Sequence, residues 1–265
     1  MAQIHPLANV HKDAKLGENV IVEAFATVEA DTEIGDGTWI GPNAVIFNGA
    51  RIGKNCKIFP GAIISGIPQD LKFEGETSYA IIGDNTTIRE FVTVNRGTKS
   101  KGKTIIGNNC LLMAYVHVAH DCIIGNHVIL VNSVQIAGEV EIDDWAVLGG
   151  TTAVHQFVKI GKHVMVQGGS KLNQDVPPYV RAGRDPVQYY GVNSIGLRRR
   201  GFTNEQIRHI QDMYRILFQQ GRSVKKAVEI IEKQFEPSEE REEILNFVRN
   251  SERGLIKGFR SDNDN

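Results

Sequence analysis

The chain has 265 residues, 23% of them charged, and its net charge is −1 at pH 7. This balance excludes a general electrostatic attraction to nucleic acid or to an anionic membrane. The sequence has no apolar run of about 18 residues, and its N-terminus, MAQIHPLANV, lacks a basic region followed by an apolar stretch. We therefore expect no membrane span, no secretory signal and a cytoplasmic location.

A six-residue period runs from Ile4 to Leu172. Of the 29 positions in this series (4, 10, 16 and onward), 26 are Ile, Leu or Val, and the exceptions are Asp70, Glu76 and Ser100. Helices repeat every 3.6 residues and strands every 2, so neither produces this period. It is typical of a hexapeptide β-helix, in which short parallel strands wrap a prism. The sequence therefore predicts a mainly β fold of this class.

A second register supports this interpretation. Two residues before each of the 26 fitting positions stands Ala, Val, Thr, Ser or Cys. Side chains two apart in a strand point the same way, so both registers should face the interior, and residues 18 apart should stack on neighbouring coils. Cys56, Cys110 and Cys122 lie in the small register, so we expect buried thiols rather than nucleophiles, metal ligands or disulfides.

Two segments interrupt the period, at residues 65–81 and 95–105. Pro, Gly and charged residues replace the core pattern there, so both segments should be loops that leave the prism. The second carries four basic residues, and a solvated loop or a contact with an acidic partner or phosphates would each explain them. These residues are Arg96, Lys99, Lys101 and Lys103.

The period stops after Pro177 and Pro178, and residues 179–201 look irregular. Thr203 to Gln206 reads as a capping box that opens a helix ending near Gly221. Apolar spacing predicts further helices starting at Ser223 and after Ser238. We therefore expect a β-helix over 1–190 and an α-helical domain over 191–265.

None of the seven histidines in the β-helix is on an inward register. We expect His117, His120 and His155 to differ from solvated histidines. Gly138 and Gln156 should stack over His120 on successive coils, and His155 lies beside Gln156. A histidine beside Asp121 is a plausible general base, and the Gly138 N–H could stabilise an oxyanion. This combination suits acyl transfer to a hydroxyl group. Solvated histidines are expected at four other positions: His5, His11, His127 and His163.

Nine segments together make a family resemblance specific, and it covers the whole chain. They are 69–72, 88–90, 96–98, 119–122, 137–138, 152–157, 163–166, 174–179 and 196–202. With these motifs the chain resembles the acyl-carrier-protein:UDP-N-acetylglucosamine O-acyltransferases, which catalyse the first step of lipid A synthesis.

The resemblance implies a homotrimer of left-handed β-helices with active sites in the clefts between subunits. Acyl carrier protein would donate a 3-hydroxyacyl group and UDP-N-acetylglucosamine would accept it, without any metal or bound cofactor. His120 would take the proton from the sugar 3-hydroxyl, Asp121 would support the imidazolium, and the Gly138 amide would hold the oxyanion.

The resemblance also implies substrate contacts. Gln69, Asp70 and Lys72 would contact the sugar nucleotide. The nucleotide or carrier-arm path would be lined by His117, His155, Gln156, Asn193, Arg199 and Arg200. Gly168 aligns with the residue that limits acyl-chain length, and a glycine there implies a long chain, at least of the hydroxymyristoyl class.

Two departures from the family pattern occur: Glu139 stands where many relatives have His after the oxyanion glycine, and Asn95 stands where some have His.

Three rival interpretations remain open. One is the N-acyltransferase of the same pathway, which carries an additional N-terminal domain. Another is a zinc carbonic anhydrase-like trimer using His117, His120 and His155. The third, a non-catalytic solenoid, would show regular outward ladders that this sequence lacks.

Overall fold

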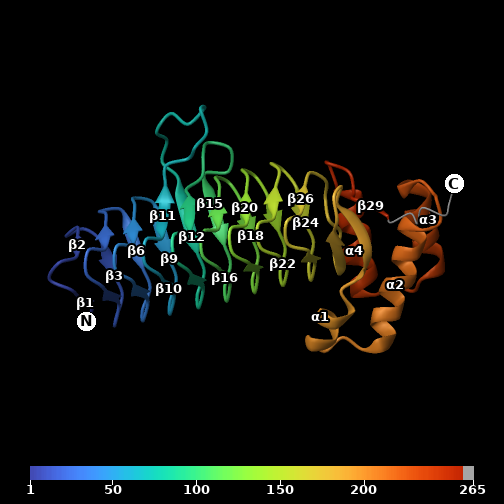
Figure 1. The fold of residues 1–265 in the computed structure, drawn as a ribbon, viewed down its shortest axis with the longest axis horizontal. Helices are drawn as coiled ribbons and strands as arrows, with labels where there is room; N and C mark the ends of the chain where they lie inside the picture. The colour runs from blue at the N-terminus through green and yellow to red at the C-terminus, as the bar shows by residue number, and fades with distance from the viewer. Residues whose placement is uncertain (259–265) are drawn as a thin grey trace.

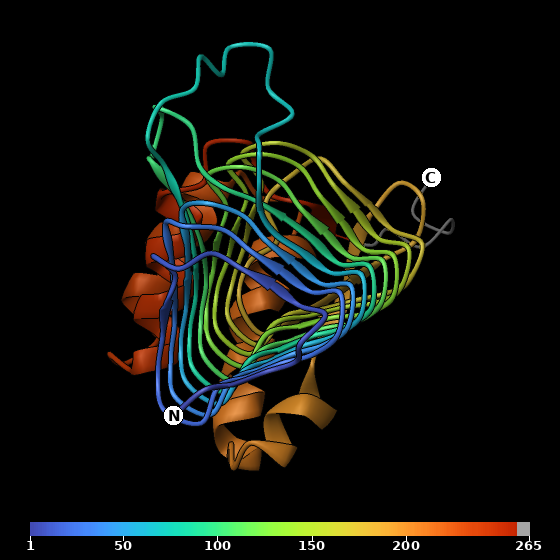
Figure 2. The same ribbon diagram turned by 90° about the vertical axis from the view of Figure 1, so that its left-hand side faces the viewer.

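The computed structural model describes residues 1–258, so residues 259–265 of the predicted helical domain lie outside the described part. The chain forms a left-handed parallel β-helix followed by helices, which confirms the predicted fold class (Figure 1). Viewed along its axis, the coils outline a triangular prism (Figure 2).

Three sheets form the faces of the prism. Sheet A has 12 strands, in spatial order β1 (Gln3–Ile4), β4 (Ile21–Val22), β7 (Trp39–Ile40), β10 (Lys57–Ile58), β13 (Thr87–Ile88), β16 (Leu111–Leu112), β19 (Ile129–Leu130), β22 (Val147–Leu148), β25 (Met165–Val166), β27 (Val180–Gly183), β28 (Gln188–Val192) and β29 (Lys257–Gly258). Sheet B has nine, β2 (Asn9–Val10), β5 (Thr27–Val28), β8 (Val45–Ile46), β11 (Ile63–Gly66), β14 (Thr93–Asn95), β17 (His117–Val118), β20 (Gln135–Ile136), β23 (Ala153–Val154) and β26 (Lys171–Leu172). Sheet C has eight, β24 (Lys159–Ile160), β21 (Glu141–Ile142), β18 (Ile123–Ile124), β15 (Lys103–Ile106), β12 (Tyr79–Ile82), β9 (Ala50–Ile52), β6 (Thr32–Ile34) and β3 (Lys15–Leu16).

The parallel ladders confirm the 18-residue coil. His117 pairs with Gln135, and Gln135 pairs with Ala153. Coils that contain the interruptions are longer, because Ile63 pairs with Thr93 and Thr93 pairs with His117. The ladder therefore keeps its register across both loops.

The interior of the prism holds the two predicted registers. The three cysteine side chains are buried and free, as expected. Burial raises the pKa of the Cys122 thiol to about 12, so it stays protonated and unreactive at neutral pH. The position of Cys122 beside His120 in the sequence therefore has no catalytic meaning.

Both interruptions are loops, and both are shorter than predicted because the flanking strands run further. The first joins β11 to β12 across residues 67–78, and the second joins β14 to β15 across residues 96–102. The two loops project from the same edge of the prism (Figures 1 and 2).

The prediction that residues 179–201 are irregular is wrong. β27 pairs in parallel with β25 and antiparallel with β28, so a hairpin extends sheet A, and the short helix α1 (Ser194–Arg199) follows. Sequence periodicity missed this hairpin because an antiparallel return has no six-residue repeat.

Three longer helices follow α1 and precede β29: α2 (Asn204–Phe218), α3 (Val224–Gln234) and α4 (Glu239–Arg249). Thr203, with the capping box to Gln206, Ser223 and Ser238 are their N-caps, which confirms the predicted starts. α2 ends before the predicted Gly221. No helix within residues 1–258 is both long and apolar enough to cross a bilayer.

A buried aspartate joins the last coil to the C-terminal segment. The Asp175 carboxylate accepts hydrogen bonds from the Lys159 amide (2.8 Å), the Ser251 hydroxyl (2.7 Å) and the Arg253 amide (3.3 Å). The segment after α4 is thereby held against the prism.

Candidate active site

His120 lies at the corner between β17 and β18. The next residue, Asp121, adopts a left-handed backbone conformation with φ of 59°. This turn brings its carboxylate back to the ring, so that His120 Nδ1 and Asp121 Oδ2 are 2.9 Å apart. Because the carboxylate accepts, Nδ1 carries the proton and Nε2 is left as the free acceptor of the ring.

Asp121 is fully buried, and donors from the second loop surround its carboxylate. It accepts hydrogen bonds from the Thr98 amide (3.0 Å to Oδ1), the Thr98 hydroxyl (2.7 Å to Oδ2) and the Lys101 amide (3.1 Å to Oδ1). Backbone N–H groups can only donate, so both carboxylate oxygens are fixed as acceptors. The second loop therefore fixes the group that orients His120.

Gly138 stacks on His120, as the 18-residue coil predicts. A Cβ atom placed on Gly138 would lie only 2.6 Å from His120 Nε2, so the ring occupies the space a side chain would need. Within residues 1–258 the Gly138 amide donates to no acceptor, although the residue is buried. Buried amides normally have a partner, so this one is available to an incoming oxygen atom.

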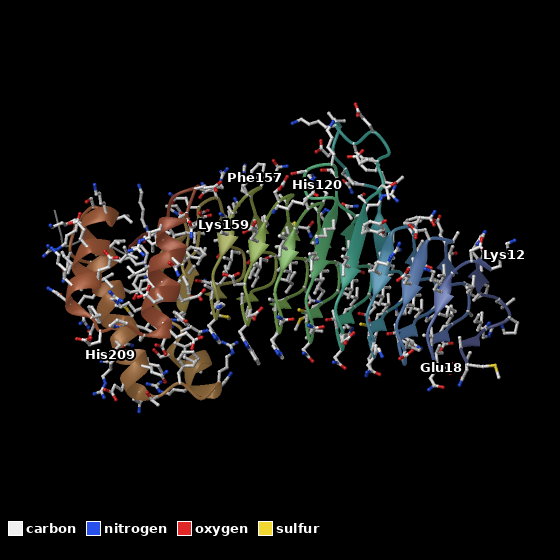
Figure 3. All side chains as sticks on the ribbon, turned by 180° about the vertical axis from the view of Figure 1, so that it is seen from behind. Lys12, Glu18, His120, Phe157, Lys159 and His209 are labelled. Carbon is white, nitrogen blue, oxygen red and sulfur yellow. The ribbon has the colours of Figure 1, made fainter. Side chains whose placement is uncertain are left out.

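A cavity of about 600 Å³ opens beside His120. Its lining comes from both loops and from the stacked turns: Gln69, Asp70, Leu71, Lys72, Thr98, Lys99, Ser100, His120, Glu139, Gln156 and Phe157. His120 and Phe157 lie along the edge from which the loops project (Figure 3). Asp70 Oδ2 is 3.9 Å from His120 Nε2, and the Lys72 amide donates to Asp70 Oδ1 at 2.9 Å.

The other two predicted histidines lie near this corner. His117, on the outward face of sheet B, has Nδ1 2.7 Å from Thr93 Oγ1, and burial, then the charge of His120, lowers its pKa. His155 is exposed, with Nδ1 3.2 Å from the Gln156 carbonyl oxygen.

Three predicted site residues lie away from His120, at the corner between sheets C and A. Asn193 caps α1, and its Nδ2 donates to the His163 carbonyl at 2.9 Å. Arg200 donates to the Trp145 carbonyl at 3.1 Å, and Arg199 is exposed. In one chain, α1 and the loops lie on different edges of the prism (Figures 1 and 2).

The prediction that His163 is solvated is wrong. Its ring stacks on Tyr179 (centroids 5.6 Å apart), and Nδ1 accepts from Arg200 Nη1 at 3.3 Å. Burial, followed by the positive charges of Arg200 and Lys162, lowers the pKa of His163 to about 4. The His127 ring also stacks, on Trp145, with ring centroids 3.9 Å apart. Residues 18 apart in the sequence are neighbours at this corner too.

Gly168 lies at the third corner, between β25 and β26. An added Cβ would meet the carbonyl oxygen of Gly150 at 3.0 Å and its nitrogen at 3.5 Å. Gly168 and Gly150 on the neighbouring coil therefore contribute no side chains at this point of the corner.

Thr98, Ser100 and Lys101 are contacts that sequence reasoning missed. Thr98 and Lys101 hold Asp121, and Ser100 Oγ donates to Glu139 Oε1 at 2.5 Å. The basic residues of the loop also have internal partners, since Lys101 Nζ lies 3.1 Å from Glu141 Oε1 and Lys99 Nζ lies 3.7 Å from Glu74 Oε2. The break in the period at Ser100, the basic residues of the loop and the motif at 96–98 pointed to this segment, but none of them indicated contacts with Asp121 or Glu139.

Comparisons with known proteins agree with this geometry. A family described as "Udp N-acetylglucosamine O-acyltransferase; Domain 2" matches residues 175–256, and one described as "Bacterial transferase hexapeptide (six repeats)" matches 31–66 and 103–138. The acyl-[acyl-carrier-protein]–UDP-N-acetylglucosamine O-acyltransferase of Campylobacter lari is 46% identical, over 96% of this chain and 97% of that protein.

Solved structures agree as well. The crystal structure of LpxA, a UDP-N-acetylglucosamine acyltransferase from Bacteroides fragilis, is 51% identical with a TM-score of 0.94, covering 96% of this chain and 99% of that one. The UDP-N-acetylglucosamine acyltransferase of Francisella novicida is 38% identical, also with a TM-score of 0.94, over 98% and 95%. Identity at this level over nearly the whole length decides among the interpretations that the sequence left open. The chain belongs to the family of acyl-[acyl-carrier-protein]–UDP-N-acetylglucosamine O-acyltransferases.

Proposed function

We propose that this member of the family moves a 3-hydroxyacyl group from acyl carrier protein to the 3-hydroxyl of UDP-N-acetylglucosamine, with His120 as general base. The observation that carries the proposal is the position of His120. Its Nδ1 faces the buried Asp121 carboxylate at 2.9 Å, while its Nε2 lies over Gly138 and beside the cavity.

The reaction begins when Nε2 of His120 takes the proton of the acceptor hydroxyl. The oxygen then attacks the thioester carbonyl carbon, and Asp121 stabilises the imidazolium that forms. The free Gly138 amide donates to the oxyanion of the tetrahedral intermediate. When the carbon–sulfur bond breaks, the imidazolium returns its proton to the leaving thiolate, which restores the neutral histidine.

Substrate contacts follow from the cavity. Gln69, Asp70 and Lys72 approach His120 from the first loop, and we assign them to the sugar nucleotide, whose diphosphate suits the Lys72 cation. His117, His155 and Gln156 lie next to the same corner and would contact the nucleotide or the carrier arm. Asn193, Arg199 and Arg200 are too distant in one chain, so they would serve the cleft of a neighbouring copy.

This division of the site supports a homotrimer. Exposed apolar side chains on the prism also favour an interface: Phe91 and Tyr115 stack with centroids 5.4 Å apart and are 52% and 58% exposed. Ile123 is 39% exposed on another face. Contiguous exposed apolar surface commonly marks a protein contact. Sedimentation of the purified protein checks the trimer, and a monomer with full activity would contradict the shared site.

We further propose that Gly168 admits a long acyl chain, of the hydroxymyristoyl class or longer, because neither it nor Gly150 on the neighbouring coil has a side chain.

Three free buried thiols fit a reducing compartment, so we assign the enzyme to the cytoplasm. We also assign it to the first step of lipid A synthesis. We assign the β-helix to residues 1–190 and the helical domain to 191–265, a boundary that falls within β28, shortly before α1 begins at Ser194.

The proposal is tested by assaying the protein with UDP-N-acetylglucosamine and a panel of 3-hydroxyacyl carrier proteins. We expect transfer with a long-chain optimum. His120→Ala should lower kcat by about 100- to 10,000-fold, the usual contribution of a positioned general base, with unchanged circular dichroism. Near-normal turnover by His120→Ala would refute the role of His120, and no transfer to the sugar nucleotide by the native protein would refute the reaction.

A further inference from the structure

Glu139 joins the His120 corner to the second loop through both its backbone and its side chain. Its amide donates to the His120 carbonyl at 3.0 Å. Its carboxylate accepts from the Ser100 hydroxyl at 2.5 Å, and Lys101 Nζ lies 3.6 Å from Oε2. The Glu139 side chain is only 15% exposed, whereas Ser100 is exposed, so the hydrogen bond between them lies at the surface of the cavity.

Ser100 lies between Thr98 and Lys101, the two loop residues that donate hydrogen bonds to the Asp121 carboxylate. Its own amide donates to Thr98 Oγ1 at 3.2 Å, and that hydroxyl donates to Asp121 Oδ2 at 2.7 Å. On the other side of Ser100, the Lys101 amide donates to Asp121 Oδ1 at 3.1 Å. A shift of Ser100 would therefore move donors on both sides of the carboxylate.

Glu139 is the side-chain partner of the Ser100 hydroxyl among the described residues. The neighbouring Lys99 amide is held from the first loop, by Glu76 Oε1 at 2.8 Å. Glu141 lies two residues beyond Glu139 and contacts Lys101 Nζ at 3.1 Å, but it does not contact Ser100 and its side chain is 40% exposed. Both Glu139 and Glu141 thus contact Lys101, but only Glu139 contacts Ser100. Glu141 is therefore a matched control for Glu139.

We propose that Glu139 is a positioning residue for the transfer step: it holds Ser100 so that Thr98 and Lys101 keep Asp121 aligned with His120. The inference rests on the proposed role of His120 as general base. Glu139 acts through the hydrogen bond to Ser100, and its charge is secondary. It lines the cavity but does not bind the acceptor.

The test compares kcat and KM for UDP-N-acetylglucosamine among matched variants. Glu139→Ala should lower kcat about 10-fold and leave KM within about 2-fold, because the defect lies in the transition state rather than in ground-state binding. Glu139→Gln keeps an oxygen acceptor for Ser100, so its kcat should stay within about 3-fold of the native value. Glu141→Gln should stay within about 2-fold, since surface charge contacts have small effects.

A double-mutant cycle isolates the contact itself. Ser100→Ala should reproduce the loss seen for Glu139→Ala, and the double variant should be no slower than either single variant, because both remove the same interaction. Thermal unfolding of each variant checks that the loss of kcat is not a loss of folded protein.

Several outcomes would overturn the inference. One is an unchanged kcat in Glu139→Ala; another is a rise in KM alone, which would mean direct acceptor contact. Multiplicative losses for Ser100→Ala and Glu139→Ala, or a Glu139→Gln variant as slow as Glu139→Ala, would also contradict it. His120→Ala is measured alongside: if it remains active, the general-base proposal fails. If it is inactive while Glu139→Ala is normal, only the positioning role fails.

Discussion

His120 and His163 lie at two corners of the same prism, and the difference between them is the charge of the partner. His120 faces a buried carboxylate, whereas His163 faces the Arg200 guanidinium. Burial first, and the guanidinium second, oppose the charged form of the His163 ring. One fold thus presents a ring ready to accept a proton at Nε2 and a ring whose pKa is lowered to about 4, so that it stays neutral at physiological pH.

The comparison shows that orientation on a β-helix does not define function. Both rings point away from the interior, and each is partly covered by a segment from outside the regular coils. For His120 this cover is the second loop, with Thr98 and Lys101. For His163 it is the segment around α1, with Asn193 and Arg200.

Among changes around the two rings, the largest expected effect comes from removing the carboxylate charge beside His120. Asp121→Asn should lower kcat by about 100- to 1,000-fold, because the amide no longer stabilises the imidazolium or fixes its tautomer. Steady-state kinetics measures this loss. Asp175→Asn is the matched control, since that carboxylate is equally buried but distant from His120; it should lower Tm and leave kcat per folded molecule unchanged. Equal kcat losses in the two variants would contradict the assignment.

A smaller effect is expected from a methyl group under the ring. In Gly138→Ala the new Cβ would lie 2.6 Å from His120 Nε2, so the imidazole must move. We expect kcat to fall by about 10- to 100-fold, as for a misplaced catalytic group. Tm should change little, because the ring can swing toward the cavity. A crystal structure of the variant with an unmoved ring and normal turnover would disprove this steric account.

The smallest effect concerns the pH dependence of stability at the other corner. The pKa of His163 is about 4 in the folded chain against 6.5 as its ordinary value, so the unfolded chain binds more protons between these values. The neutral His163 ring therefore contributes fully to the free energy of unfolding above about pH 6.5. This contribution, roughly 1 kcal/mol after allowance for solvent, is lost as the pH falls toward 4. His163→Phe keeps the stack and removes the titration, and Phe157 tolerates the same left-handed conformation.

Denaturant unfolding of both proteins at pH 7 and pH 5 measures this difference. The variant is needed because Asp143 changes stability with pH in the opposite direction. Burial, then the charge of Glu243, raises the pKa of Asp143 to about 6, so its contribution to stability falls as the pH rises. An identical pH dependence in native protein and His163→Phe would contradict the lowered pKa of His163.

The regular coils could be predicted because an inward apolar residue recurs at every sixth position. The stack of His120 and Gly138 followed from the 18-residue coil, since parallel ladders leave no choice of register once the interior is apolar. The loops were predictable as interruptions, but the contacts of Thr98, Ser100 and Lys101 were not. Their positions depend on turns with no period, which fold back onto a carboxylate 20 or more residues away.

The Arg200 corner was misread for a related reason. His163 and Arg200 are separated by a hairpin and a helix that sequence analysis described as irregular, so nothing indicated that they meet. The prediction of a solvated His163 failed because its ring is covered by Asn193 and Arg200, which lie beyond the regular coils, as well as by Tyr179.

Neutron diffraction from crystals at neutral pH distinguishes the two rings, because it locates the exchangeable hydrogen on each of them. We expect a deuteron on Nδ1 of His120, shared with Asp121, and a bare Nε2 beside the cavity. For His163 we expect the reverse, with a bare Nδ1 accepting from Arg200 and a deuteron on Nε2. A neutral His120 with its deuteron on Nε2 would contradict the assignment of this ring as the general base.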